Sequence, residues 1–280
     1  MSRLVVQHPA LADEAVAAFA AAVGRAPGLR VDTLAAWKDA GITAAQVTRL
    51  AGQWSVDAEI VPAGARLTDY RLIAFDMDST LITVECVDEI ADCAGRKAEV
   101  AAITEAAMRG EIADYDESLR RRVALLEGLP VEVLQQVYDE RVRTSPGAER
   151  LIGECRRAGL KVMVVSGGFT FFTDRLRARL GLDYTHASSL GVANGRLTGR
   201  LVGEIVNAEV KKRVLEQVCA DAGITPAQAI VVGDGANDLK MMSVAGMSVA
   251  YRAKPIVRSE TTHAINHCGL DAVLGFFAGS

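Results

Sequence analysis

The sequence of 280 residues has few aromatic residues and no excess of positive charge. Phe, Trp and Tyr together make up 5% of it, and 35 acidic residues against 31 basic ones give a formal net charge of −4. Proteins that bind nucleic acids usually carry basic stripes, and many of them stack bases on aromatic rings. Nucleic acid is therefore not expected as a partner.

Cysteine is also scarce, and its spacing argues against two kinds of site. The cysteines are odd in number and form no C-x-x-C pair; they are Cys86, Cys93, Cys155, Cys219 and Cys268. This pattern is typical of reduced thiols in a cytoplasmic protein, not of a disulfide framework or a zinc site. His263 and His267 lack the acidic residue of an H-E-x-x-H site, so we expect ordinary polar residues near a strand end.

No hydrophobic run is long enough to cross a bilayer. The most apolar stretch, AVAAFAAAVG at 15–24, is much shorter than the roughly 20 residues that a spanning helix needs. Asp13 and Glu14 precede it, where a signal peptide would carry basic residues. We therefore expect an amphipathic helix in a cytoplasmic protein that has no membrane partner.

The glycine-rich loops that bind nucleotides are missing as well. No G-x-x-x-x-G-K-[ST] sequence occurs. GDGAND at 233–238 begins like a dinucleotide fingerprint, but Asp238 stands at its third glycine position and Asp234 would repel a pyrophosphate. DMDSTL at 76–81 lacks the glycine and the final glutamate of a calcium-binding EF-hand loop.

Residues 1–66 are expected to form a small α+β unit. Short β-branched runs alternate there with helical patterns. The expected elements are strands at 3–7, 29–37 and 56–61, and helices at 11–24 and 43–54. The stretch PAGARLTD at 62–69 then serves as a linker.

The rest of the chain alternates apolar runs with helical stretches. The runs are LIAF before Asp76, KVMVV before Ser166 and AIVV before Gly233. Continuous apolar runs are typical of strands that are buried on both faces. The helical stretches are 146–158, 168–180, 210–222 and 237–245. The alternation predicts an α/β fold with a Rossmann-like parallel sheet, built from residues 70–84 and 146–280.

Two further segments fit onto this sheet. Asn194-Gly195, within 191–203, predicts a β-hairpin at its edge. Residues 85–145 read as a helical cap inserted after the first strand, with helical segments at 87–95, 98–110, 114–128 and 130–142. An insert at the carboxyl end of a strand is well placed to cover a site.

The polar residues at the ends of the apolar runs predict a magnesium and phosphate site. Ligands of open parallel sheets bind beyond the carboxyl ends of the strands. The run endings offer Asp76, Asp78, Ser166-Gly167-Gly168, Asp234 and Asp238. Two like charges about 4 Å apart cost on the order of 4 kcal/mol even at an effective dielectric of 20, so the carboxylates need a cation. Mg²⁺ suits them, because it uses few carboxylates and leaves coordination positions for a phosphate oxygen.

Lys211 lies in the first turn of the helix that is expected at 210–222. Its ammonium could hold a transferring phosphoryl group. It also stands beside Lys212 and Arg213, and the residues alone favour a solvated lysine.

Taken in order, these motifs resemble those of the haloacid dehalogenase superfamily. DMDST at 76–80, SGG at 166–168, Lys211 and GDGAND at 233–238 carry the resemblance. Within the superfamily, residues 70–275 look like the bacterial phosphoserine phosphatases. The resemblance implies Mg²⁺-dependent hydrolysis of O-phospho-L-serine to L-serine and phosphate through an aspartyl-phosphate, the last step of L-serine biosynthesis. Residues 1–66 resemble a degenerate ACT-type regulatory domain.

The resemblance also implies roles for the acidic residues. Asp76 would be the nucleophile, and Asp78 would protonate the leaving oxygen and then activate water. Asp76, the backbone carbonyl of Asp78 and Asp234 would hold Mg²⁺, with Asp238 in support.

The remaining roles concern the substrate. By the same resemblance, Ser166, the Gly167 amide and Lys211 would bind the phosphoryl oxygens, and Asn237 would line the pocket. Glu85 would bind the ammonium group of phosphoserine, and Arg122 its carboxylate.

The sequence leaves alternatives to phosphoserine hydrolysis open. A related phosphate such as phosphohomoserine is one, because an added methylene changes fit by only about 1–3 kcal/mol. A phospho-accepting receiver domain also gathers acidic residues, but it has no use for Asp78 or for the insert 85–145. A serine-binding regulatory protein would leave the three motifs unexplained. The sequence leaves a homodimer and control by serine open.

Overall fold

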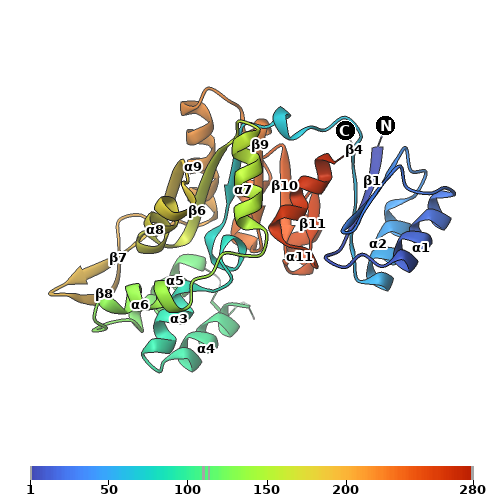
Figure 1. Cartoon of the computed structure of the whole chain (residues 1–280). Coiled ribbons are helices and arrows are strands. Elements are labelled where there is room, and N and C mark those ends of the chain that lie inside the picture. The colour runs from blue at the N-terminus through green and yellow to red at the C-terminus, as the bar shows by residue number, and fades with distance from the viewer. Residues whose placement is uncertain (1, 109–110, 113, 279–280) are drawn as a thin grey trace.

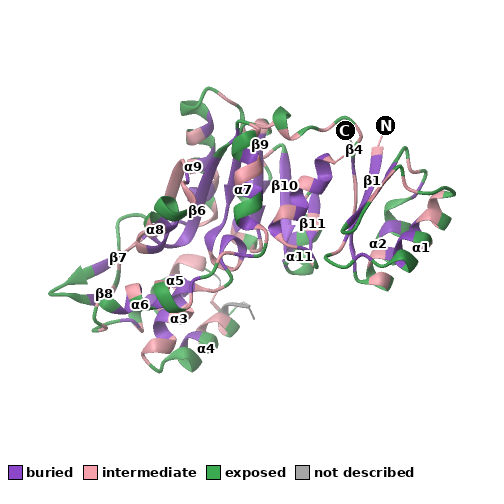
Figure 2. Cartoon of the chain, in the orientation of Figure 1, coloured by how far each residue is buried: buried purple, intermediate pink, exposed green. Residues whose placement is uncertain are grey.

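The computed structural model describes residues 2–108, 111–112 and 114–278. This part of the chain contains two β-sheets, each covered by helices (Figure 1). The smaller sheet has the strand order β2-β3-β1-β4, and the larger has the order β11-β10-β9-β5-β6-β7-β8. The central strands of both sheets are largely buried, whereas the β7–β8 hairpin and the outward faces of the helices are more exposed (Figure 2).

The smaller sheet and two helices make up the N-terminal unit. Its elements are β1 (Ser2–Gln7), α1 (Asp13–Val23), β2 (Leu29–Val31), β3 (Leu34–Lys38), α2 (Ala44–Trp54) and β4 (Asp57–Pro62). All its strand pairs are antiparallel. The prediction of one strand at 29–37 is wrong, because Leu29 pairs with Ala36 across a turn. Asp32 and Thr33 form that turn, and short polar side chains favour turns over strands.

The larger sheet confirms the predicted parallel core. Its strands are β5 (Leu72–Phe75), β6 (Lys161–Phe169), β7 (Tyr184–Ala193), β8 (Arg196–Val202), β9 (Ala229–Gly233), β10 (Met247–Tyr251) and β11 (His263–Ile265). Among the described strand pairs of this larger sheet, only β7–β8 is antiparallel. Asn194 and Gly195 join that pair with φ of 52° and 72°, the left-handed backbone that the Asn-Gly signal predicts.

Helices cover both faces of this sheet. They are α7 (Ala148–Arg157), α8 (Thr170–Leu180), α9 (Ala208–Asp221), α10 (Leu239–Met242) and α11 (Pro255–Ser259), with helical turns at Leu67–Asp69, Pro226–Gln228 and Leu270–Phe277. The helix expected at 237–245 is shorter than predicted, because a separate turn at Ala236–Asp238 precedes α10.

One further boundary differs from the sequence prediction, and it bears on the site. The helix expected at 168–180 begins at Thr170, because β6 continues in extended form to Phe169. Gly168 allows this close passage: a Cβ there would lie 2.6 Å from Met77 Cε and 2.7 Å from Asp78 Oδ2. Ser166, Gly167 and Gly168 therefore lie at the end of a strand and not in a helix.

The helical insert consists of α3 (Cys86–Cys93), α4 (Lys97–Met108), α5 (Tyr115–Ala124) and α6 (Glu132–Glu140). The predicted segment 98–110 ends in residues 109–110, which lie outside the described residues. The insert lies beside the β7–β8 hairpin (Figure 1). Backbone bonds join them: Gly128 N donates to Leu197 O at 2.9 Å, and Leu197 N donates to Leu129 O at 2.8 Å. The hairpin thus supports the insert at one end of the sheet.

The N-terminal unit docks on the other end of the larger sheet. Asp57, only 3% exposed, accepts backbone N–H groups of Asn266 at 2.7 Å, His267 at 3.1 Å and Cys268 at 2.8 Å. Gln7 Nε2 adds a bond to Ala272 O at 3.1 Å. A buried carboxylate that accepts several backbone N–H groups fixes this junction.

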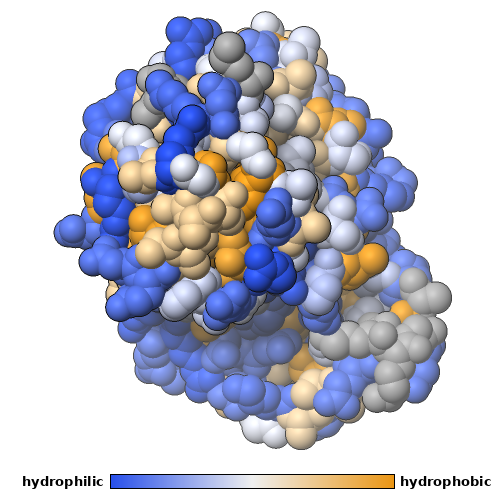
Figure 3. Space-filling model, turned by 90° about the vertical axis from the view of Figure 1, so that its right-hand side faces the viewer, coloured by the Kyte–Doolittle hydropathy of each residue, from blue (hydrophilic) through white to orange (hydrophobic). Residues whose placement is uncertain are grey.

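The outer face of the N-terminal unit is mixed in character. Figure 3 views the molecule from this side and shows a patch of apolar residues in its middle, surrounded by hydrophilic ones. Ala17 and Ala21 of α1 are among the exposed small residues. None of the described helices has the length and apolar character needed to cross a membrane.

Replacing Asp57 by Asn should weaken the junction of the two units. The amide keeps one acceptor but turns N–H groups toward backbone donors, so buried donors lose their partner. We expect the free energy of unfolding to fall by about 1–3 kcal/mol, measured by urea denaturation at pH 7. Asp32→Asn, in the exposed β2–β3 turn, is the matched control. Equal midpoints for both variants and the parent would contradict this account.

Candidate active site

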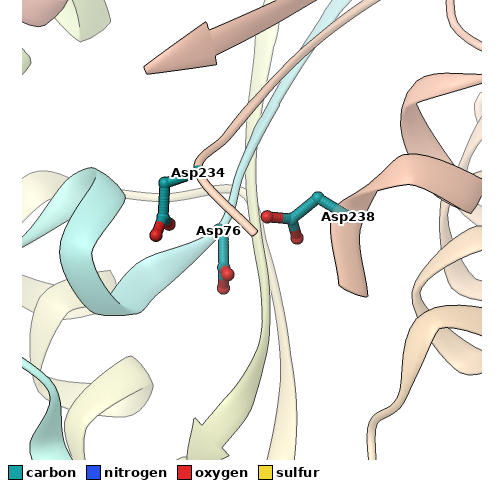
Figure 4. Close-up of side chains that lie close together, drawn as sticks. All are labelled: Asp76, Asp234 and Asp238. Atoms are coloured by element: carbon teal, nitrogen blue, oxygen red, sulfur yellow. The ribbon is translucent and has the colours of Figure 1, made fainter. Parts of the chain in front are cut away.

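The strand order brings three segments that are distant in sequence to one place. β5 lies between β9 and β6, so Asp76, Asp234 and Ser166 follow or end neighbouring strands. Asp76, Asp234 and Asp238 each offer a carboxylate oxygen, and these atoms lie within 4.8 Å of one another. Figure 4 shows the three side chains converging from two strand ends and the turn after β9.

Lys211 is the cation that this cluster encloses. Its side chain has no exposed surface, and Nζ lies 2.9 Å from Asp76 Oδ2 and 2.7 Å from Asp238 Oδ1. Burial lowers the pKa of Lys211, but Asp238 and Asp76 outweigh it and raise that pKa above its usual range. The prediction from the residues alone, that Lys211 is a solvated lysine, is therefore wrong. Its neighbours Lys212 and Arg213 do reach solvent.

A helix start places Lys211. Asn207 caps α9: its Oδ1 accepts the backbone N–H groups of Glu209 at 3.1 Å and Val210 at 3.2 Å. Lys211 N donates to Asn207 O at 2.9 Å, which closes the first turn. The lysine thus leaves the first turn of α9 toward the ends of β5 and β9.

Asp76 and Asp78 lie in different surroundings. Asp76 pairs with Lys211, and its Oδ1 accepts Met77 N at 2.6 Å. Asp78 has no such cation, and it accepts from Cys86, whose backbone N lies 3.4 Å from its Oδ1. Burial, followed by the charges of Glu85 and Asp76, raises the pKa of Asp78 well above its usual value. The geometry therefore favours an ionised Asp76 beside an Asp78 that can hold a proton.

A small cavity of about 130 Å³ opens onto these carboxylates. The site residues lining it are Asp76, Asp78, Glu85, Arg122, Ser166, Gly167, Asp234 and Asn237, together with Tyr115 and Gly168. Lys211 and Asp238 lie behind Asp76. Glu85 is held by Ser79 Oγ at 2.7 Å, and Ser79 adopts the left-handed backbone, with φ of 56°. Burial raises the pKa of Glu85, although the Ser79 bond opposes it.

Two residues at the site were not predicted from the sequence. Thr80 Oγ1 donates to Asp234 Oδ1 at 2.6 Å, and it belongs to the motif at 76–80 without having been assigned a role. Tyr115 reaches the cavity from α5, and nothing in its local sequence marks it. Both depend on contacts between segments far apart in the chain.

The residues fit a hard divalent cation. Asp76, Asp234 and Asp238 present oxygen atoms alone, which are the donors that Mg²⁺ prefers. Burial and the charge of Asp76 raise the pKa of Asp234 to about 7 and that of Asp238 to about 6, so Lys211 alone does not balance the negative charge of the cluster. His263 lies elsewhere, in β11, with Nδ1 3.3 Å from Glu59 Oε2.

Comparisons with known proteins agree with this geometry. The family model described as haloacid dehalogenase-like hydrolase matches residues 73–243. A phosphoserine phosphatase from Polaromonas sp. is 62% identical over 213 residues, which cover 75% of this chain and 90% of that protein.

Solved structures share the architecture. A haloacid dehalogenase family hydrolase from Salmonella enterica serovar Typhi superposes with a TM-score of 0.89 at 32% identity, covering 100% of both chains. A phospho-aspartyl intermediate analogue of phosphoserine phosphatase superposes with a TM-score of 0.70 at 40% identity, covering 74% of this chain and 98% of that one.

The carboxylate cluster predicts a stability that depends on pH and on metal. Because the folded pKa of Asp234 is about 7, against a usual 3.8, its ionisation destabilises the metal-free protein as pH rises from 3.8 through 7. Without metal at pH 8, Asp234→Asn should therefore unfold at a higher temperature than the parent. Adding MgCl₂ should raise the parent's Tm by about 2–8 °C, and the variant's by less.

Thermal unfolding after EDTA treatment measures both effects, with KCl at equal ionic strength as the control. If MgCl₂ raises the Tm of parent and variant equally, Asp234 is not a ligand of the metal.

Proposed function

Since the chain belongs to the haloacid dehalogenase-like hydrolases, we propose that it hydrolyses O-phospho-L-serine to L-serine and phosphate. The observation that carries this proposal is the pair Asp76 and Asp78 at the end of β5, one ion-paired with Lys211 and the other with a raised pKa. Nucleophilic phosphoryl transfer needs one carboxylate ionised and another protonated. The 62% identity to a phosphoserine phosphatase supports the same activity.

The first step transfers the phosphoryl group to the protein. An Asp76 oxygen attacks phosphorus, and the bond from phosphorus to the serine oxygen breaks. Asp78 gives its proton to that leaving oxygen, so L-serine departs neutral at its hydroxyl. Asp76 then carries an acyl phosphate.

The second step restores the protein. Asp78, now ionised, takes a proton from water while the water oxygen attacks phosphorus, and the bond to Asp76 breaks. Both protons are thereby accounted for, and the pair returns to its starting state. The second carboxylate also explains why the phosphate does not persist, as it would in a receiver domain.

The strand ends and α9 supply the phosphate contacts. Ser166 Oγ, the Gly167 amide and Lys211 bind the phosphoryl oxygens in this proposal, and Asn237 lines the same cavity. These groups are held before substrate arrives, which favours charge stabilisation in the transition state. Gly168 N donates to Ser166 Oγ at 2.9 Å, so the serine hydroxyl is already oriented.

Mg²⁺ is the metal we propose. Asp76, the Asp78 backbone carbonyl and Asp234 would hold it, and Asp238 would support it while pairing with Lys211. When bound, the ion would withdraw negative charge from the phosphoryl oxygens. Thr80 fixes the Asp234 carboxylate for this role.

Opposite charges recognise the amino-acid end of the substrate. Glu85 would bind the ammonium group, and Arg122 the carboxylate, both within the cavity above Asp76. Arg122 Nε is buried without a partner among the described residues, so it has a donor free for a ligand. A planar guanidinium pairs with a carboxylate through two hydrogen bonds.

Each unit of the chain has its own role in this proposal. Residues 70–84 and 146–280 form the catalytic core, 85–145 form a cap over it, and 1–66 form an ACT-like unit that is a candidate for regulation. All five cysteines are free thiols, which supports a place in the cytoplasm.

The direct test is phosphate release from a panel of small esters, with and without Mg²⁺. O-phospho-L-serine should be the best substrate, and EDTA should abolish release. If glycerol phosphate or phosphohomoserine reacts as well as phosphoserine, the proposed substrate is wrong.

Asp78→Asn should keep substrate binding and lose turnover. The amide cannot pass a proton to the leaving oxygen, so kcat should fall by a factor on the order of 10²–10⁴ with little change in KM. Steady-state phosphate release measures both constants. Asp174→Asn, on the exposed face of α8, serves as the matched control. A kcat within about threefold of the parent would remove Asp78 from proton transfer.

Arg122→Lys should weaken recognition of the amino-acid end alone. An ammonium cannot reproduce the two-bond contact, so KM for phosphoserine should rise about 10- to 100-fold. Hydrolysis of p-nitrophenyl phosphate, which has no carboxylate, should change by less than about threefold. Arg121→Lys, one residue earlier and exposed, is the control. Equal losses on both substrates would contradict the assigned contact.

A further inference from the structure

The first turn of α5 touches the core at two points, beside the groups that we propose bind the phosphoryl oxygens. Tyr115 packs on Gly167 so closely that a Cβ there would lie 1.9 Å from the tyrosine hydroxyl oxygen. Asp116 accepts from Asn207 Nδ2, at 3.1 Å to Oδ1 and 3.3 Å to Oδ2. Among these residues only Asn207 bonds to both the insert and α9.

Asn207 uses both ends of its amide. Its oxygen accepts the N–H groups of Glu209 and Val210, so its nitrogen must be the atom that faces Asp116. The same residue therefore fixes the start of α9, which carries Lys211, and the start of α5. One side chain links the phosphate-binding lysine to the insert.

The contact also governs the position of Arg122. Tyr115, Leu119 and Arg122 follow the spacing i, i+4, i+7, which places them on one face of α5. Tyr115 and Arg122 both line the active-site cavity. Holding the first turn of α5 at Asp116 thus sets the rotation and the depth of the helix that presents Arg122 to the substrate.

The contact is partly open to solvent. Asp116 and Asn207 also line a separate cavity of about 520 Å³, together with Arg200 and Glu204. Arg120 Nη2 lies 3.9 Å from Asp116 Oδ2 and offers the carboxylate another partner. The bond between insert and core can therefore break without leaving a buried charge unpaired, unlike the bonds of Lys211.

We propose that Asn207 is a positioning residue: its hydrogen bond to Asp116 holds α5 against the core so that Arg122 meets the substrate's carboxylate while Lys211 meets its phosphate. This inference rests on the proposed phosphatase activity and deepens it. Asn207 touches no reacting atom, and it acts through the two helices whose first turns it joins.

The test reverses the pair. Asn207→Asp keeps the cap of α9, since Asp caps helices as well as Asn does, but sets two carboxylates face to face. Asn207→Ser keeps a capping oxygen without adding charge, and is too short to reach Asp116. The double variant Asn207→Asp with Asp116→Asn restores one donor and one acceptor, with the net charge of the parent.

The expected result separates position from stability. Asn207→Asp and Asn207→Ser should lower kcat/KM for O-phospho-L-serine by about 10- to 100-fold, mainly through KM, because a bond to a charged group is lost. p-Nitrophenyl phosphate should be affected by less than about threefold, since it makes no use of Arg122. The reversed pair should recover most of the loss, and thermal unfolding should show that all variants are folded.

Three results would overturn the inference: unchanged kcat/KM in both single variants, no recovery in the reversed pair, or equal losses on both substrates. The parent enzyme distinguishes this failure from that of the proposed function. If the parent does not hydrolyse phosphoserine, the function is wrong; if the parent is active and the variants match it, only the role of Asn207 is wrong.

Discussion

The ammonium of Lys211, buried between Asp76 and Asp238, is the interaction on which the rest of the site depends. A lysine without exposed surface is tolerable only when it is paired, because an isolated buried charge is very costly. Asp76 follows β5, Asp238 lies in the turn after β9, and the lysine itself comes from α9. One ion-pair cluster thus holds together three segments that are distant in sequence.

The charges of this cluster do not cancel. Lys211 compensates Asp76 and Asp238 only in part, and Asp234 adds a further carboxylate whose pKa is about 7. A divalent cation completes the balance, which ties metal binding to stability. Asp78 stands outside the ion pairs, and its raised pKa follows from burial and from its acidic neighbours. The difference between Asp76 and Asp78 is therefore a difference of partners, since the two side chains are chemically identical.

The two units attached to the core are joined to it in contrasting ways. Asp57 of the N-terminal unit is buried and accepts three backbone N–H groups, so that junction is fixed. The insert meets the start of α9 through Asp116, which accepts from Asn207, has a second partner in Arg120 and borders a cavity. Strong, buried bonds suit a permanent junction, and exchangeable ones suit a cover that must admit substrate and release product.

The sequence by itself determined the parallel core, the β7–β8 turn and the motif residues, because apolar runs, Asn-Gly and strand-end polar residues are local patterns with direct structural meaning. It did not determine the turn at Asp32, the extension of β6 through Gly168, the burial of Lys211 or the places of Tyr115 and Asn207. Those depend on which segments meet after the chain folds. The local sequence around a helical lysine is the same whether solvent or two carboxylates surround the side chain. Only the tertiary structure decides which of these environments the lysine has.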